Sequence, residues 1–140
     1  MTALTEEKVR RWAADVGPRG SSIPVAAGAI IHRGALVVRN AAGYLIPLSG
    51  TTGSYAGIAL QTVTGGAADG DVWCDVAQDI EEVVGPTVGT HTVANIGDPV
   101  YATDDSGDYT HDNTGAMQVG ELSGFDGTNF RVRHKTETEV

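Results

Sequence analysis

From Ile23 onward, short apolar runs alternate with turn-forming residues. The runs are rich in Val, Ile, Ala and Thr, and segments of Gly, Asn, Asp and Pro separate them. Runs of this composition, bounded by such turns, predict strands rather than helices. The expected strands cover residues 29–31, 35–39, 44–48, 56–63, 72–76, 81–84, 99–102, 109–110, 118–122 and 129–134. Their regular spacing predicts a mainly β fold, a compact barrel or sandwich of short strands.

Residues 1–22 follow a different pattern and are expected to form an N-terminal arm. Val9, Trp12, Ala13 and Val16 have the i, i+3, i+4, i+7 spacing of one apolar helix face. A threonine and two glutamates precede this stripe, as is common where a helix begins. The pattern predicts a short amphipathic helix. Because a helix of this length is marginal alone in water, it must dock on its own domain or on a partner.

The β domain is expected to cover residues 23–135, followed by a C-terminal tail at 136–140. Within it, residues of about 34–76 and 97–134 form a weak internal repeat. In each copy a glycine starts a strand that carries a valine, a polar turn follows, and a later strand begins with small residues. Three pairs are 63 positions apart, namely Gly34 and Gly97, Val37 and Val100, and Gly57 and Gly120. Two related structural units are therefore expected.

Charge is distributed unevenly along the chain. The net charge is −9, and between Asn40 and Phe130 there are thirteen Asp and Glu but no Lys or Arg. Phosphate binding needs a basic surface, so the composition argues against nucleic acid and anionic lipid as partners. Two interpretations stay open. The acidic residues are a solvated face, or the domain is polarised, with its basic ends directed at an acidic partner.

The chain is not expected to enter a membrane. No apolar run approaches the ~20 residues that a membrane-spanning helix needs. Charged residues near the N-terminus lie where the apolar part of a secretory signal would be. The one cysteine, Cys74, lies in an apolar-polar run and is expected to be a buried, inert thiol. Synthesis in a reducing cytoplasm fits this cysteine usage.

The acidic segment 97–110 is a candidate metal loop. A calcium loop of the EF-hand kind needs a glycine at position six and a bidentate glutamate at position twelve. Counting from Asp104 places glycines at positions four and twelve, so the pattern fails. The corresponding turn in the first repeat, residues 39–43, carries no carboxylate. We therefore expect a hairpin turn, with no metal ion and no cofactor.

No catalytic motif is present, and the chain is not expected to be an enzyme. The four histidines lack close spacing, and HExxH, CxxC, GxSxG, Walker and GxGxxG patterns are absent. Asp79, Glu81 and Glu82 could pair as acid and base, but such a stretch is equally typical of a strand with an exposed edge. A hydrolase using Asp79, Glu81 or Asp105 is a third hypothesis, and no catalytic residue is assigned.

Five segments follow one another within about residues 23–135, namely AAGAIIHRGALVVRN, AGIALQTV, VWCDVAQDIEEV, ANIGDPVYATDD and QVGELSGFDGTNFRVR. Their order resembles that of the capsid cement, or head decoration, proteins of tailed bacteriophages. The resemblance implies a structural protein that binds the major capsid protein on the outer surface of the phage head and stabilises the expanded shell. It also implies a virion location after synthesis in the host cytoplasm, often a homotrimer, and no catalytic or cofactor residues.

Arg10, Arg11, Trp12 and Arg19 are the candidate capsid-binding residues, because Trp and Arg are common interface anchors. The arm would grip the shell while the acidic loops face water. Removing residues 1–20 is then expected to weaken head binding and leave the core folded. In the alternative interpretation, Trp12 closes the open end of its own barrel.

A second hypothesis for the function is a carbohydrate- or receptor-binding module of a virion fibre or spike. Such a module needs an exposed aromatic platform near acidic or amide side chains. Tyr55, Tyr101 and Tyr109, beside the segment 104–108, are the candidates for this platform.

Overall fold

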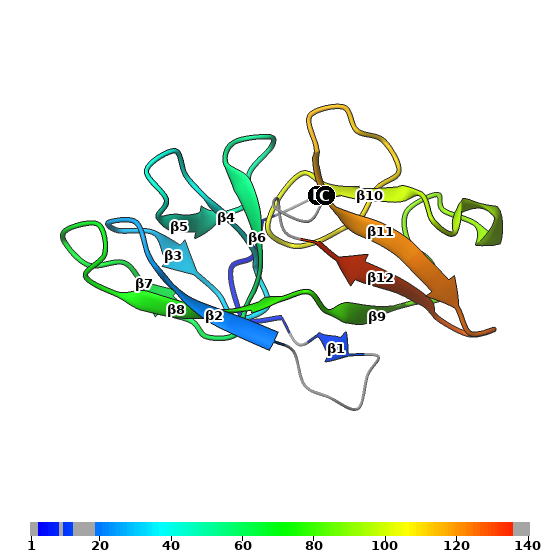
Figure 1. Cartoon of the computed structure of the whole chain (residues 1–140), viewed down its shortest axis with the longest axis horizontal. Helices are drawn as coiled ribbons and strands as arrows, with labels where there is room; N and C mark the ends of the chain where they lie inside the picture. The colour runs from blue at the N-terminus through cyan, green and yellow to red at the C-terminus, as the bar shows by residue number, and fades with distance from the viewer. Residues whose placement is uncertain (1–2, 9, 13–18, 136–140) are drawn as a thin grey trace.

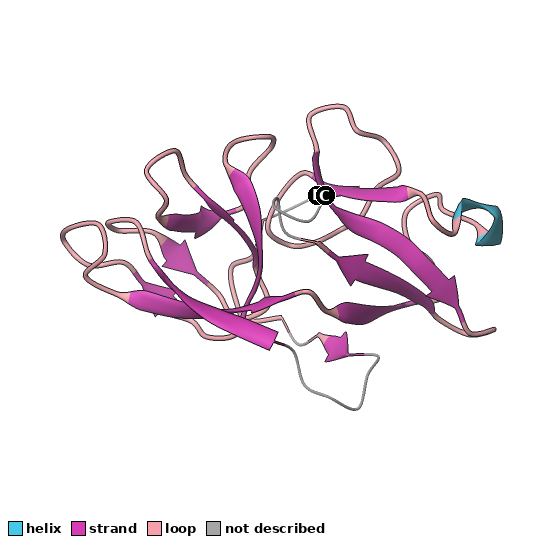
Figure 2. Ribbon diagram, viewed as in Figure 1, coloured by secondary structure: helices cyan, strands magenta, loops and turns pink. Residues whose placement is uncertain are grey.

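The computed structural model of the protein describes residues 3–8, 10–12 and 19–135, with the backbone alone at residues 11, 12, 19 and 20. Short strands dominate this part of the chain, and its one helix is a 3-10 turn (Figure 2). The elements are β1 (Arg11–Trp12), β2 (Arg19–Pro24), β3 (Ile30–Ile31), β4 (Leu36–Arg39), β5 (Leu45–Pro47), β6 (Ser54–Ala59), β7 (Val63–Thr64), β8 (Trp73–Gln78), β9 (Glu81–Gly85), η1 (Val93–Asn95), β10 (Pro99–Ala102), β11 (Met117–Phe125) and β12 (Phe130–His134). The mainly β prediction is confirmed.

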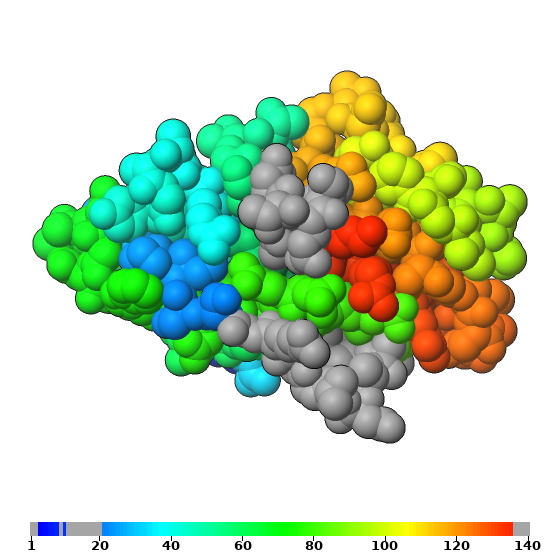
Figure 3. Space-filling model, viewed as in Figure 1, coloured from blue at the N-terminus to red at the C-terminus, as the bar shows by residue number. Residues whose placement is uncertain are grey.

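The strands form two five-stranded sheets and one small sheet, all with antiparallel neighbours (Figure 1). The N-terminal sheet has the order β2-β8-β6-β4-β5, and the C-terminal sheet has the order β1-β9-β12-β11-β10. Strands β3 and β7 form the small sheet. The sheets pack as in a sandwich, and the strands of the described residues do not close into a barrel. The first and second halves of the chain occupy opposite ends of the molecule (Figure 3).

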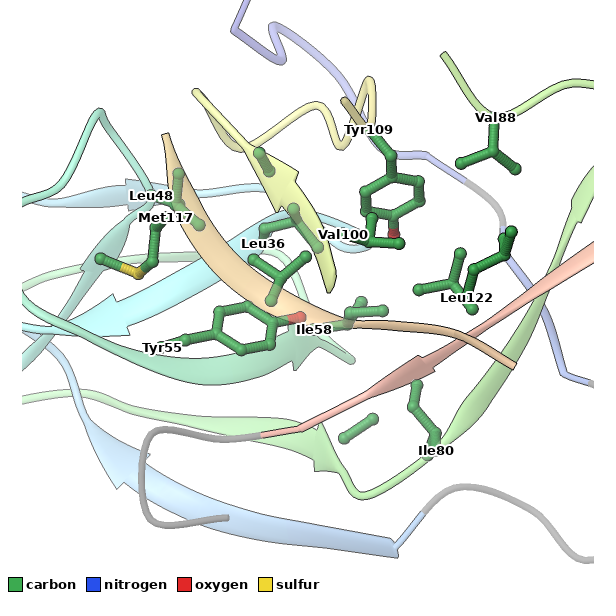
Figure 4. Close-up of a cluster of buried hydrophobic side chains, with 14 of the residues drawn as sticks. Leu36, Leu48, Tyr55, Ile58, Ile80, Val88, Val100, Tyr109, Met117 and Leu122 are labelled. Atoms are coloured by element: carbon green, nitrogen blue, oxygen red, sulfur yellow. The ribbon is translucent and has the colours of Figure 1, made fainter. Parts of the chain in front are cut away.

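Residues 36–38 of strand β4 are buried on both faces, which explains their unbroken apolar sequence. Leu36 joins a core between the two large sheets (Figure 4), and Val38 belongs to the same core. Val37 joins a second core between the N-terminal sheet and the β3-β7 sheet. Successive side chains of a strand point to opposite faces, so a strand with a core on each side must be apolar throughout.

The two repeated segments have the same strand order and the same register. In each unit the valine lies opposite the glycine, and the pairing becomes irregular at the next residue. The first glycine of each unit also donates its backbone N–H to an equivalent carbonyl. The equivalent contacts are Val37–Gly57 and Val100–Gly120 across the strands, and hydrogen bonds Gly34–Ala59 and Gly97–Leu122 of 2.8 and 2.7 Å. Residues that are 63 positions apart in the sequence thus occupy equivalent places in the two units.

The amphipathic helix predicted for the N-terminal arm is absent from the described residues 3–8 and 10–12. Arg11 and Trp12 instead form β1, which pairs with Val83 and Glu82 of β9. Pairing with an open sheet edge satisfies backbone N–H and C=O groups that a short helix at the surface leaves to water. Residue 9 and residues 13–18, which carry the rest of the predicted stripe, lie outside the described residues.

The expected boundary between arm and domain at residues 22 and 23 falls inside a strand. Strand β2 runs from Arg19 to Pro24 and pairs with β8 along its whole length. Within the described part of the chain, the arm is therefore built into both large sheets: β1 is an edge strand of one and β2 of the other.

Candidate functional site

Five polar side chains meet between the two large sheets and form what we call the polar cluster. They are Arg10, which precedes β1, Tyr55 on β6, Glu82 on β9, Tyr109 in the loop after β10, and His134 at the end of β12. The Arg10 side chain is 2% exposed, and Glu82 is 4% exposed. Residues far apart in sequence thus bring acid, base and hydroxyl groups together inside the protein.

Glu82 is the centre of this cluster. Its Oε2 accepts a hydrogen bond of 2.9 Å from Arg10 Nη1, which is also an ion pair. Its Oε1 accepts hydrogen bonds of 2.6 Å from the Tyr109 hydroxyl and 2.9 Å from His134 Nε2. A buried carboxylate is stable only when paired and hydrogen-bonded, and Glu82 has both kinds of partner.

The ring of His134 uses both nitrogens within the cluster. Nε2 faces the Glu82 carboxylate, which can only accept, so Nε2 carries a proton. Nε2 also lies 3.1 Å from the Tyr109 hydroxyl. Nδ1 lies 2.8 Å from the Tyr55 hydroxyl, a group that can both donate and accept. His134 therefore links the two tyrosines to Glu82.

The surroundings shift the pKa values of these groups in defined directions. Burial alone would raise the pKa of Glu82, but the hydrogen bond from His134 and the charge of Arg10 outweigh it and hold this pKa at about 2. Burial also acts against the charge of Arg10, yet Tyr109 and Glu82 raise its pKa above the ordinary value. Burial raises the pKa of both Tyr55 and Tyr109.

The arrangement is suited to holding the fold together rather than to reacting with a substrate. The two hydroxyls stay protonated because their pKa values are raised, whereas a tyrosine nucleophile needs a lowered pKa. The groups are buried and satisfy one another. The cluster joins Tyr55 of the N-terminal sheet to Glu82 and His134 of the C-terminal sheet, and it joins both sheets to Arg10.

The segment around Arg10 also connects the two repeated units through its backbone and neighbouring side chains. Lys8 N–H donates to the carbonyl of Arg33, directly before the first unit, at 2.8 Å, and Arg10 Nε donates to the carbonyl of Gly34, where this unit begins, at 2.7 Å. Lys8 Nζ and Arg10 Nη2 donate to the Ser106 carbonyl in the second unit, at 2.6 and 3.0 Å. Residues 3–8 and 10 therefore form a strap across the seam between the units.

The structure corrects the assignment of Arg10 as a capsid-binding residue. Its guanidinium is buried and is engaged by Glu82, Tyr109 and two carbonyls, so it offers no surface to a partner. The structure also argues against the expectation that the core stays folded without residues 1–20, because their removal would leave Glu82 buried without the guanidinium of Arg10. Arg11 and Trp12 lie on β1 and Arg19 lies on β2, where their side chains are outside the described part.

The residues of the proposed aromatic platform do not form one. Tyr55 is 0% exposed and Tyr109 is 6% exposed, and both hydroxyls belong to the polar cluster. Tyr101 alone is half-buried, on β10. Two of the three candidate tyrosines are thus core residues, because their side chains point between the sheets.

The carboxylates considered for hydrolysis have separate partners. Asp79 lies 3.7 Å from Arg133, and Glu81 lies 3.8 Å from Arg131. Asp105 is buried and accepts the Leu4 N–H at 2.9 Å. Glu82 lies on the inner face rather than on an exposed edge. In the sequence, its two-residue spacing from the apolar Ile80 is the signal for this face.

The acidic segment forms a turn, as predicted. Asp104 Oδ1 accepts hydrogen bonds from the N–H and hydroxyl of Ser106, and Tyr101 pairs with Thr110 across the turn. Among the residues that the structure describes, no three His, Cys, Asp or Glu side chains come together in a way that could hold a metal ion. Cys74 is buried, as predicted, and burial raises the pKa of its thiol to about 11.

The basic residues at the C-terminal end face the chain's own carboxylates. Arg131 lies near Glu81 and Asp126, Arg133 lies near Asp79, and Lys135 lies 3.2 Å from Glu121. These pairs are at the surface and contribute little stability. They do balance the charge of this face, which weakens the interpretation of a basic end directed at an acidic partner.

Large apolar side chains are exposed at two opposite ends of the molecule. Ile30 on β3 and Trp73 at the start of β8 are 57% and 55% exposed, at the end formed by the first half (Figure 1). Val93 of η1 and Ile96 and Phe125 nearby in the second half are 56%, 43% and 37% exposed. Ile30 and Val93 are 63 positions apart, the spacing of the repeat.

No protein-family model matches the sequence, and no curated protein matches it either. Among the described residues, no helix has the length and apolar character that crossing a membrane requires.

The pKa of Glu82 predicts acid sensitivity of the fold. Its folded value of about 2 is below the ordinary 4.5, so its stabilisation is complete above about pH 4.5 and is lost as the pH falls toward 2. A shift of this size corresponds to about 3 kcal/mol. Urea unfolding at a series of pH values should show this loss in the wild type and a flatter profile in Glu82→Gln. Equal slopes for the two proteins would contradict the assignment.

Proposed function

We propose that the protein is a decoration protein of a tailed-phage head. It binds the outer surface of the assembled shell as a homotrimer, contacts the major capsid protein and stabilises the expanded form. The observation that carries the proposal is the exposure of large apolar side chains at the two ends of a double unit whose polar cluster is internal. A protein built in this way is suited to binding neighbouring surfaces rather than to converting a substrate.

Two separated contact regions suit a protein that bridges subunits of a lattice. Burial of an exposed Trp, Ile or Phe side chain contributes roughly 1.5–3 kcal/mol, which the loss of rotational and translational freedom partly offsets. Once one end is bound, the other binds at high effective concentration, so modest contacts give stable attachment. Arg11, Trp12 and Arg19, on edge strands of the two large sheets, are further proposed contacts.

The test is co-sedimentation of the full-length protein with heads assembled from the major capsid protein of the same genome, before and after expansion. We expect saturable binding to expanded heads, and an about tenfold weaker affinity for Trp73→Ala. Thr64→Ala is the matched control. Thr64 is exposed on β7 at the same end, and this substitution removes no large apolar side chain. Failure of the wild-type protein to sediment with either kind of head would refute the proposal. The oligomeric state is tested separately, by light scattering of the free chain.

A further inference from the structure

A surface groove lies at the far end of the C-terminal sheet. Its lining residues are Glu81, Ser123, Gly124, Phe125, Asp126 and Arg131, and its volume is about 260 Å³. We call it the β11 groove, because four of the six residues belong to the end of β11 or follow it directly. None of these residues takes part in the polar cluster, so the groove needs its own explanation.

Two β-bulges flank Arg131 in this groove. On one side, β11 pairs Leu122 with Val132 and then Gly124 with Arg131, so Ser123 is an extra residue. On the other side, Val83 is opposite Arg131 and Gly85 is opposite Phe130, so β9 also carries an extra residue. Bulges re-aim side chains and are frequent beside binding sites.

The groove contains hydrogen-bonding groups without partners. Within the part of the chain that the structure describes, Ser123 Oγ and Arg131 Nε are buried and have no hydrogen-bond partner. The outer nitrogens of Arg131 lie 3.8 Å from Glu81 and from Asp126, which is too far for hydrogen bonds. Buried polar groups are almost always satisfied, so the unpartnered Ser123 hydroxyl and Arg131 Nε are exceptions. The rest of the Arg131 side chain is 38% exposed and is open to an acceptor from outside.

The remaining lining defines the chemistry of that acceptor. Glu81 and Asp126 flank Arg131, so a carboxylate or phosphate would meet two like charges, whereas a neutral carbonyl oxygen would not. Phe125 is 37% exposed and packs on Phe130 with ring centroids 4.5 Å apart, which offers an apolar face beside the donors. A carbonyl next to an apolar side chain is the pattern of a peptide segment.

We propose that the β11 groove binds an uncharged peptide segment of the shell protein, with a backbone carbonyl on Arg131 and an apolar side chain against Phe125. The proposal rests on the proposed function and names one contact within it. A second copy of this chain fits the groove less well. The end that exposes Trp73 also exposes Asp69, Asp71 and Asp75, which would face Glu81 and Asp126 in a head-to-tail contact.

The test compares two arginines of the same strand. Arg131→Lys keeps the charge but removes Nε and the planar fork, and Phe125→Ala removes the apolar face. Arg133→Lys is the matched control, since Arg133 lies on the same strand, also faces a carboxylate at 3.7 Å and lies outside the groove. Binding to expanded heads is measured by co-sedimentation, with thermal unfolding of each variant to show that it is folded.

We expect Arg131→Lys and Phe125→Ala each to weaken head binding about tenfold, with Arg133→Lys unchanged. Residues 123–126 should also become protected from hydroxyl-radical labelling on the heads. If the wild type binds heads and the two variants bind equally well, the groove proposal is overturned while the proposed function stands. If the wild type does not bind heads at all, the proposed function itself is refuted, and the groove proposal with it. Light scattering that shows self-association lost in Phe125→Ala would assign the groove to a second copy and also overturn the proposal.

Discussion

Replacement of Arg10 by methionine is expected to lower the free energy of unfolding by about 3–5 kcal/mol, because it leaves a carboxylate buried without its cation. Glu82 would keep the hydrogen bonds from Tyr109 and His134 but lose the ion pair of 2.9 Å. The carbonyls of Gly34 and Ser106 would lose a donor as well. Chemical denaturation monitored by tryptophan fluorescence measures the effect.

The double variant Arg10→Met with Glu82→Gln is the control for this prediction. A neutral glutamine no longer needs the cation, and its oxygen can still accept from Tyr109, so the double variant should be more stable than the sum of the single changes predicts. Strict additivity of the two single variants would show that Arg10 and Glu82 do not act as a pair. A loss below about 1 kcal/mol in Arg10→Met would show that the strap contributes little to the fold.

Replacement of Gly120 by alanine is expected to destabilise the protein by about 1–3 kcal/mol, because the added methyl group would overlap the Arg133 carbonyl oxygen of the neighbouring strand. Gly57 lies at the equivalent place of the first unit, where a Cβ atom would overlap the Ala77 carbonyl oxygen. Gly57→Ala should have an effect at least as large, because Gly57 also has a positive φ of 130° that disfavours any side chain. Thermal unfolding of the two variants and the wild type measures both losses of stability.

Gly124 provides the matched control on the same strand as Gly120. A Cβ atom at Gly124 would have no atom within 4 Å, so Gly124→Ala should change the free energy of unfolding by less than about 0.5 kcal/mol. Equal destabilisation by Gly120→Ala and Gly124→Ala would mean that the loss comes from glycine conformation rather than from the close approach of the strands.

Local pattern was sufficient to predict most strands. The run at residues 99–102 matches β10, and the runs at 35–39 and 44–48 match β4 and β5 within one residue at each end. Strands of this kind are bounded by turn residues, whose backbone preferences act over a few neighbours. The repeat could be found for a similar reason: each copy carries its glycine and valine at the same offset, and both pack in the same register.

The strap and the polar cluster could not be found in this way. Arg10 and Glu82 are separated by 72 residues, and Tyr55 and His134 by 79. In the sequence, Arg10 lies between apolar residues whose spacing predicts a helix. Tyr55 and Tyr109 lie beside polar turns, which suggests that their side chains are exposed. Which side chains face the seam between the sheets depends on how the two units pack, and no short window of sequence contains that information.

The amino-acid sequence by itself determined the β class of this protein, most of its strand and turn positions, and the doubling of one structural unit. These features follow from alternation, turn chemistry and spacing, which act over a few residues or repeat at a constant interval. The tertiary structure decided that the N-terminal segment becomes an edge strand and that its arginine is buried as the partner of Glu82. It did so because an open sheet edge and a buried carboxylate exist only after distant strands have packed together.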